Sequence, residues 1–192
     1  MSNKLGGWAI SEELHEWILN NLNKGDTILE LGSGHGTIEL CKNYNMYSIE
    51  HNPKWVGLSS KANYISAPIK KYDNYRWYDI SKLSDLNKIR YDLIIVDGPT
   101  GDIGREGFLH NIHLFDTNST IIMDDTNREV EMNLAKKIAL FSNLRSDRIF
   151  SSHDVNSIYT IPSILHKQKF DTLLYGKLGL KIEETKKLQV WE

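Results

Sequence analysis

The chain has 192 residues, of which 40% are hydrophobic and 25% are charged, with a formal net charge of −2 and a single cysteine. These totals are typical of one globular domain, exclude a disulfide framework or cysteine-based zinc cluster, and argue against a broad basic face for nucleic acid. Since no apolar run approaches the length of a membrane span and residues 1–7 lack a signal-peptide core, we expect a cytoplasmic protein without a membrane partner.

The first element is an amphipathic helix after Ser11. Ser11 is a typical N-cap, two acids follow in the first turn, and apolar residues recur at helical spacing as far as Leu22. Alternating helical and strand patterns then predict strands at 27–31, 47–50, 63–67, 91–97 and 119–123, and helices at 37–43, 53–56, 81–89, 106–115 and 127–140. Residues 70–78 have no clear period and are predicted to be a loop with aromatic anchors.

Two closing strands, 148–150 and 157–161, are predicted to form an antiparallel hairpin. Strands that alternate with helices predict an α/β fold, a Rossmann-like, doubly wound and mostly parallel seven-stranded sheet with this C-terminal hairpin. We expect a single domain over residues 1–192, with an N-terminal helix segment at 1–24. The pattern leaves the C-terminal extension, 163–192, unassigned.

A glycine-rich turn follows the first predicted strand. Gly32, Gly34 and Gly36 stand at alternate positions, where they let the backbone turn sharply and approach a ligand closely. Glu50 ends the next strand 18 residues after Gly32, at the place where an acid accepts hydrogen bonds from ribose hydroxyls. Thr37 stands where the dinucleotide fingerprint requires its third glycine. The spacing predicts a cradle for a nucleotide-like ligand.

This window, with Glu30 inside the strand, resembles motif I of the class I S-adenosylmethionine-dependent methyltransferases. The resemblance implies S-adenosylmethionine as the cofactor, with its methionine part at the glycine turn and its ribose at Glu50. The candidate cofactor-binding residues are Glu30, Gly32, Ser33, Gly34, Glu50, His51, Ala67 and Asp97.

Carboxylates also follow the later predicted strands. Asp97 ends one, and Asp124 with Asp125 ends the next, so all three are expected at the same edge of a parallel sheet as the glycine turn. Hard oxygen ligands of this kind suit Mg²⁺, and a carboxylate there could also orient or deprotonate a methyl acceptor.

The segments around these acids, 93–98 and 121–125, resemble motifs of the catechol O-methyltransferase group. The resemblance implies a divalent metal such as Mg²⁺ held by Asp97, Asp124 and Asp125, with Asp97 and Asp125 as catalytic residues. The sequence departs from the group at Asp125, where Asn is usual, and at Pro99-Thr100, where a lysine is expected. The alternative is that Asp97 acts without a metal and the Asp pair caps the next helix.

A second resemblance covers four segments, 48–55, 67–69, 77–79 and 97–105. They are similar to polysaccharide methyltransferases of the glucuronoxylan type and to a set of bacterial methyltransferases of unassigned substrate. Arg105 lies in a glycine-bracketed loop here, where a guanidinium could bind a carboxylate or phosphate of the substrate; the alternative is a surface arginine in a turn.

The predicted function is therefore an S-adenosylmethionine-dependent O-methyltransferase acting on a small-molecule or sugar-containing hydroxyl, with or without a divalent metal. Methylation of a nucleobase is disfavoured because Asp97-Gly98-Pro99-Thr100 lacks the Pro-Pro-aromatic pattern of those enzymes. Two alternatives stay open, an NAD-dependent oxidoreductase and a non-catalytic nucleotide-binding module. The sequence defines neither the acceptor nor the oligomeric state.

Overall fold

The computed structural model describes residues 10–142, 145–150, 163–166 and 181–184. The strands in these ranges are β1 Thr27–Leu31, β2 Asn45–Glu50, β3 Asn63–Ser66, β4 Ile69–Lys71, β5 Arg76–Tyr78, β6 Leu93–Val96, β7 Thr120–Met123, β8 Arg145–Phe150, β9 Ser163–His166 and β10 Lys181–Glu184. The helices are α1 Glu12–Asn21, α2 His35–Leu40, α3 Gly107–His110 and α4 Glu129–Phe141, with 3₁₀ turns η1 Ile80–Lys82, η2 Leu86–Lys88 and η3 Ile112–Leu114.

The described strands form one eight-stranded sheet in the order β10-β8-β9-β7-β6-β1-β2-β3, and β4 pairs with β5 in a separate hairpin. Neighbours from β7 to β3 run parallel, whereas β9 is antiparallel to both β7 and β8, and β10 is antiparallel to β8. The predicted Rossmann-like α/β fold with its parallel sheet is confirmed. The described part has eight strands in the main sheet rather than seven.

The predicted closing hairpin is only partly visible. Residues 148–150 do lie in an antiparallel strand, β8, but its described partners are β9 and β10, from the extension that the sequence pattern left unassigned. The predicted second strand, 157–161, lies outside the described residues.

Three other predicted elements differ from the structure. The loop predicted at 70–78 contains the β4–β5 hairpin, closed by the Tyr72 amide donating to the Tyr75 carbonyl at 2.8 Å; its strands of three residues are too short to show a period. The 53–56 helix is a series of turns, and the 81–89 helix is two separate 3₁₀ turns. In both, an acidic or amide side chain binds a backbone N–H two residues on, as Asn52 and Asp79 do, and so favours a turn.

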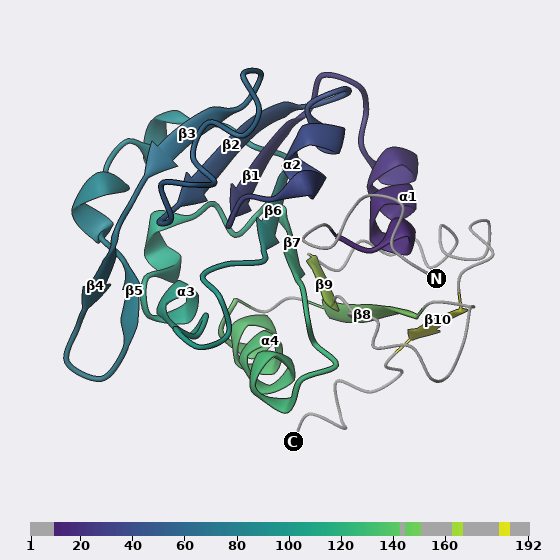
Figure 1. Ribbon diagram of the computed structural model, residues 1–192. Coiled ribbons are helices and arrows are strands. Elements are labelled where there is room, and N and C mark those ends of the chain that lie inside the picture. Colours follow the sequence, from purple (N-terminus) through teal and green to yellow (C-terminus); the bar gives the residue numbers. More distant parts are fainter. Residues whose placement is uncertain (1–9, 143–144, 151–162, 167–180, 185–192) are drawn as a thin grey trace.

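Alternate residues of the central strands face two helical layers. On one face Ile28 and Met46 pack with α1 and α2, and on the other Leu29 and Leu31 pack with α3, α4 and the buried Trp77 of β5. Figure 1 shows α1 on one side of the central strands and α3 and α4 on the other. These strands are therefore buried on both faces, and ligands can reach them only at their ends.

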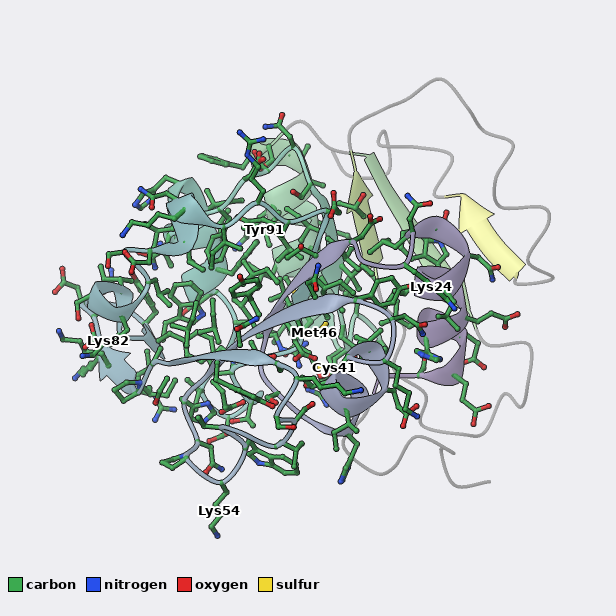
Figure 2. The ribbon with its side chains drawn as sticks, turned by 90° about the horizontal axis from the view of Figure 1, so that it is seen from above. Lys24, Cys41, Met46, Lys54, Lys82 and Tyr91 are labelled. Carbon is green, nitrogen blue, oxygen red and sulfur yellow. The ribbon has the colours of Figure 1, made fainter. Side chains whose placement is uncertain are left out.

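Figure 2 shows the same contrast between interior and rim. Met46 of β2 lies in the middle of the molecule, whereas Lys54 projects from the turn region after β2 and Lys82 lies at the edge. Cys41 is buried in the same core cluster as Met46. Within the described ranges, no helix combines the length and apolar character that crossing a bilayer requires.

Candidate functional site

A cavity of about 770 Å³ opens at the carboxyl ends of β1, β2, β6 and β7. This is the edge of the sheet where the sequence places its glycine turn and its acids. The residues that line it are Gly32, Ser33, Glu50, His51, Asn52, Trp55, Tyr78, Asp97, Gly98, Pro99, Thr100, Gly101, Asp102, Arg105, Asp124, Asp125 and Arg128.

The turn after β1 requires a glycine at its first position. Gly32 has φ +91°, in the left-handed region, and a Cβ there would lie 3.0 Å from the backbone nitrogen of Gly98. The Gly32 amide donates to Ile49 and the Asp97 amide donates to Leu31, at 2.9 and 3.0 Å. The ends of β1, β2 and β6 are thereby held together by backbone contacts.

Glu30 supports this turn from inside the protein. Its side chain is 3% exposed, and Oε2 accepts hydrogen bonds from the hydroxyls of Thr37 at 2.7 Å and Ser48 at 2.8 Å. Burial raises the pKa of Glu30 to about 7, although these two hydrogen bonds oppose the shift. Glu30 is not among the residues of the cavity wall, so its position fits a support for the turn rather than the predicted cofactor contact.

Thr37 connects this support to α2. Its hydroxyl accepts a hydrogen bond from the Gly34 amide at 3.0 Å and lies 3.2 Å from the Ser33 hydroxyl. Because this contact caps the helix, α2 begins at His35, two residues before the predicted start. The residue that breaks the dinucleotide fingerprint therefore has a structural role of its own.

Glu50, at the end of β2, has its carboxylate fixed by three backbone N–H groups. Oε1 accepts from the amides of His51 and Asn52 at 2.7 and 2.6 Å, and Oε2 accepts from Ser33 at 2.8 Å. The His51 Nδ1 atom also lies 3.0 Å from Oε1. A carboxylate oxygen offers about two acceptor positions, so the one left for a ligand hydroxyl is on Oε2. The arrangement joins the acid directly to the glycine turn.

Arg105 is buried, with 3% of its side chain exposed, and connects the ends of β6 and β7. Its Nη2 donates to the Asp97 carbonyl at 2.7 Å, to Asp97 Oδ1 at 3.0 Å and to Asp125 Oδ2 at 2.7 Å. Its Nη1 donates to the Asp124 carbonyl at 2.8 Å. The alternative of a surface arginine in a turn is therefore wrong, and the donors of this guanidinium already have partners inside the protein. Substrate binding by Arg105 stays a prediction.

The same contacts decide whether Asp97, Asp124 and Asp125 fit the implied metal. The Arg105 guanidinium already supplies the positive charge between Asp97 and Asp125, at the place where the resemblance puts the cation. Across the described ranges, no group of three His, Cys, Asp or Glu side chains is arranged to hold a metal ion. The three carboxylates do not form the predicted metal site.

Asp97 and Asp125 differ in what they offer a ligand. The Asp97 side chain is 37% exposed toward the cavity, and burial together with the nearby Asp124 raises its pKa above the ordinary value, although Arg105 opposes the shift. Asp125 is 8% exposed, has φ 59°, and its Oδ2 also lies 3.0 Å from Arg128. Asp97 is therefore the acid that can reach a substrate, and Asp125 holds the two arginines.

The structure brings most of the predicted site residues to one wall. Gly32, Ser33, Glu50, His51, Asp97, Asp124, Asp125 and Arg105 all line the cavity. Glu30, Gly34 and Ala67 do not line it, and Ala67 is fully buried. Sequence reasoning missed Tyr78 and Arg128. The sequence did contain a signal for placing Arg128 in the site, because it follows Asp125 by three residues. It contained none for Tyr78, because the β4–β5 hairpin that positions this residue was not predicted.

The charge of the wall is strongly asymmetric. It carries five carboxylates, those of Glu50, Asp97, Asp102, Asp124 and Asp125, and two guanidinium groups, of which Arg105 is buried among the acids. Such a cavity attracts a cationic ligand. A second, more open hollow of about 1070 Å³ lies between η3 and the end of α4, but no carboxylate or glycine lines it and it shares no lining residue with the first cavity.

Two kinds of similarity to known proteins cover different parts of the chain. A family model for the N-terminus of CTP synthase matches residues 106–180, which is less than half of the chain. A CTP synthase from Azospirillum brasilense is 37% identical over 73 residues, covering 38% of this chain. The chain spans only 13% of the length of that protein, so the match does not assign the whole chain to its family.

The likeness in structure is broader. The precorrin-6y C5,15-methyltransferase of Geobacter metallireducens has a TM-score of 0.52 and 12% identity, covering 81% of this chain and 87% of that one. A methyltransferase from Pyrococcus furiosus has a TM-score of 0.51 and 14% identity, covering 83% and 84%. At such identities the shared property is the fold, and the chain has the Rossmann-like fold of these methyltransferases.

Proposed function

We propose that the chain is an S-adenosylmethionine-dependent O-methyltransferase that acts on a small-molecule or sugar-containing hydroxyl. One observation carries the proposal: the Ser33 amide of the glycine turn donates a hydrogen bond to Glu50. Both residues line a cavity that has more carboxylates than basic groups. This geometry offers a ribose acceptor and an environment for a cation in one place. S-adenosylmethionine contains both a ribose and a sulfonium.

In this proposal, separate residues bind the cofactor and accept the proton of the methyl acceptor. Glu50 uses its remaining acceptor position for a ribose hydroxyl, while Gly32 and Ser33 let the backbone approach the methionine part. Bound S-adenosylmethionine supplies an activated methyl group. Asp97 faces the cavity, and its raised pKa brings it closer to the range in which a carboxylate accepts the proton of an acceptor hydroxyl. Arg105 fixes Asp97 in place through its carbonyl and carboxylate.

The transfer would need no divalent metal, since Arg105 holds the carboxylates that the metal was expected to bind. We also propose a cytoplasmic location and an acceptor that is neither a nucleic acid nor a membrane component. These extend the expectations from charge and composition.

An NAD-dependent oxidoreductase is the less favoured alternative. The third glycine of its fingerprint allows close packing of helix on strand. Here Thr37 stands at that position, buried and hydrogen-bonded to Glu30 of β1. We propose no CTP synthase activity, because the match covers only 13% of the related protein and leaves out the glycine turn and Glu50 of this chain.

Titration calorimetry tests the cofactor. We expect heat on adding S-adenosylmethionine or S-adenosylhomocysteine and none on adding NAD. Binding of NAD without binding of either S-adenosyl compound would refute the proposal.

Asp97→Asn tests catalysis. Turnover would be followed as release of S-adenosylhomocysteine over a panel of phenolic and sugar hydroxyl acceptors, with EDTA expected to have no effect. Loss of a general base is expected to lower turnover by about 10²–10⁴-fold, while affinity for S-adenosylhomocysteine changes little. A fully active variant would show that Asp97 is structural, and binding without turnover on any acceptor would favour a non-catalytic binding module.

A further inference from the structure

Tyr78, the last residue of β5, places a phenolic hydroxyl where the ends of β1 and β6 meet. Its side chain is fully buried and belongs to the cavity wall. A methyl group on Gly98 would lie 2.5 Å from the Tyr78 hydroxyl oxygen and 2.7 Å from the Cα atom of Gly32. The hydroxyl therefore lies beside the two strand-end turns that the proposed cofactor must approach.

This hydroxyl has no hydrogen-bond partner among the described residues. Buried polar groups nearly always have a partner, and leaving one unsatisfied costs about 1–3 kcal/mol. The ring is held by packing, with the His51 ring centroid at 6.1 Å and that of Trp77 at 5.4 Å. The β4–β5 hairpin thus fixes an unpaired donor and acceptor at the wall of a ligand cavity.

The chemistry of the group is defined by its neighbours. Burial and the nearby Glu50 raise the pKa of Tyr78 well above its ordinary value, so the phenol stays neutral at physiological pH. A neutral phenol both donates and accepts a hydrogen bond. An apolar residue of the same shape would fill the space equally well, so packing alone does not explain the hydroxyl.

We propose that the Tyr78 hydroxyl binds the S-adenosyl cofactor, with the ligand supplying the hydrogen-bond partner that the protein lacks. The inference rests on the proposed function and adds to it a binding residue from outside the glycine turn and the strand-end acids. It makes Tyr78 a contact of the cofactor rather than of the methyl acceptor.

Tyr78→Phe separates binding from stability because the two should change in opposite directions. Without the unpaired hydroxyl, the ligand-free protein should be as stable as the wild type or more stable in urea denaturation. Affinity for S-adenosylhomocysteine, measured by calorimetry, should fall about three- to tenfold, the value of one neutral hydrogen bond.

Tyr72→Phe is the matched control in the same hairpin. The Tyr72 hydroxyl is paired, since it donates to the Tyr78 carbonyl and accepts from the Ile80 amide, both at 3.0 Å, and it is not part of the cavity wall. This variant should be less stable than the wild type but bind S-adenosylhomocysteine with unchanged affinity.

Three outcomes are distinct. A Tyr78→Phe variant that binds S-adenosylhomocysteine as tightly as the wild type overturns the inference and leaves the proposed function intact. A variant destabilised like Tyr72→Phe overturns it as well, because the hydroxyl would then have a partner in the protein. Failure of the wild type to bind any S-adenosyl compound refutes the proposed function itself.

Discussion

The two halves of the cavity wall hold their carboxylates in different ways. At the end of β2, Glu50 is fixed by three backbone N–H groups, two from the next residues in the chain. At the ends of β6 and β7, Asp97 and Asp125 share one guanidinium, that of Arg105. The first half is built from local backbone geometry, and the second depends on a single side chain. We therefore expect the second half to be far more sensitive to one substitution.

The segment that matches the CTP synthase N-terminus covers only part of the second half of the wall. Asp124 and Asp125 lie inside this segment, whereas Gly32, Glu50 and Asp97 lie outside it. Arg105, immediately before residue 106, joins the two parts by bonding to the end of β6 and the end of β7.

The largest effect is expected from Arg105→Met. The variant leaves Asp97 and Asp125 without their shared counter-charge and removes donors from the carbonyls of Asp97 and Asp124. Removing one partner of a buried ion pair costs about 3–5 kcal/mol. Urea denaturation should show a loss of this size in the free energy of unfolding.

Arg128→Met is its control, because Arg128 also lies 3.0 Å from Asp125 but its side chain is 51% exposed. A half-exposed ion pair contributes less than about 1 kcal/mol. Equal losses for the two variants would contradict the idea that Arg105 alone holds this half together.

The contrast also explains how far the sequence could predict the site. The glycine turn and Glu50 were predictable because their contacts are local and follow strand spacing. The role of Arg105 was not, because its partners come from two strand ends and its sequence context is an ordinary glycine-bracketed loop. Tyr78 was missed since the hairpin strands that carry it have three residues each. The parallel sheet was predicted from its apolar runs, but β9 and β10 lie in a Lys-rich tail without a clear pattern.

A smaller effect is expected at Glu30, beneath the first half. Because its pKa is about 7 in the folded protein and its ordinary value is 4.5, the folded state binds more protons than the unfolded state between these pH values. The free energy of unfolding should therefore fall by about 3 kcal/mol at most as pH rises from 4.5 to 7. It should stay at the lower value above pH 7.

Glu30→Gln removes this titration while keeping an oxygen for Thr37 and Ser48. The variant should gain stability relative to the wild type as pH rises from 5 to 8, measured by urea denaturation at each pH. A difference that does not change with pH would mean that Glu30 is already ionised in the folded protein at pH 5.

The smallest effect should come from Gly32→Ala, which tests the backbone geometry of the first half against Gly25→Ala. Both glycines have φ +91°, but a Cβ at Gly25 meets nothing within 4 Å, whereas one at Gly32 lies 3.0 Å from the Gly98 nitrogen. The left-handed conformation alone costs alanine about 1–2 kcal/mol, and Gly32→Ala should lose about 1 kcal/mol more through crowding. Since that crowding pushes the β1 and β6 turns apart, Gly32→Ala should also weaken binding of S-adenosylhomocysteine, and Gly25→Ala should not. If both variants lost the same stability and kept full affinity, close contact between the two turns would not be what shapes this half of the cavity.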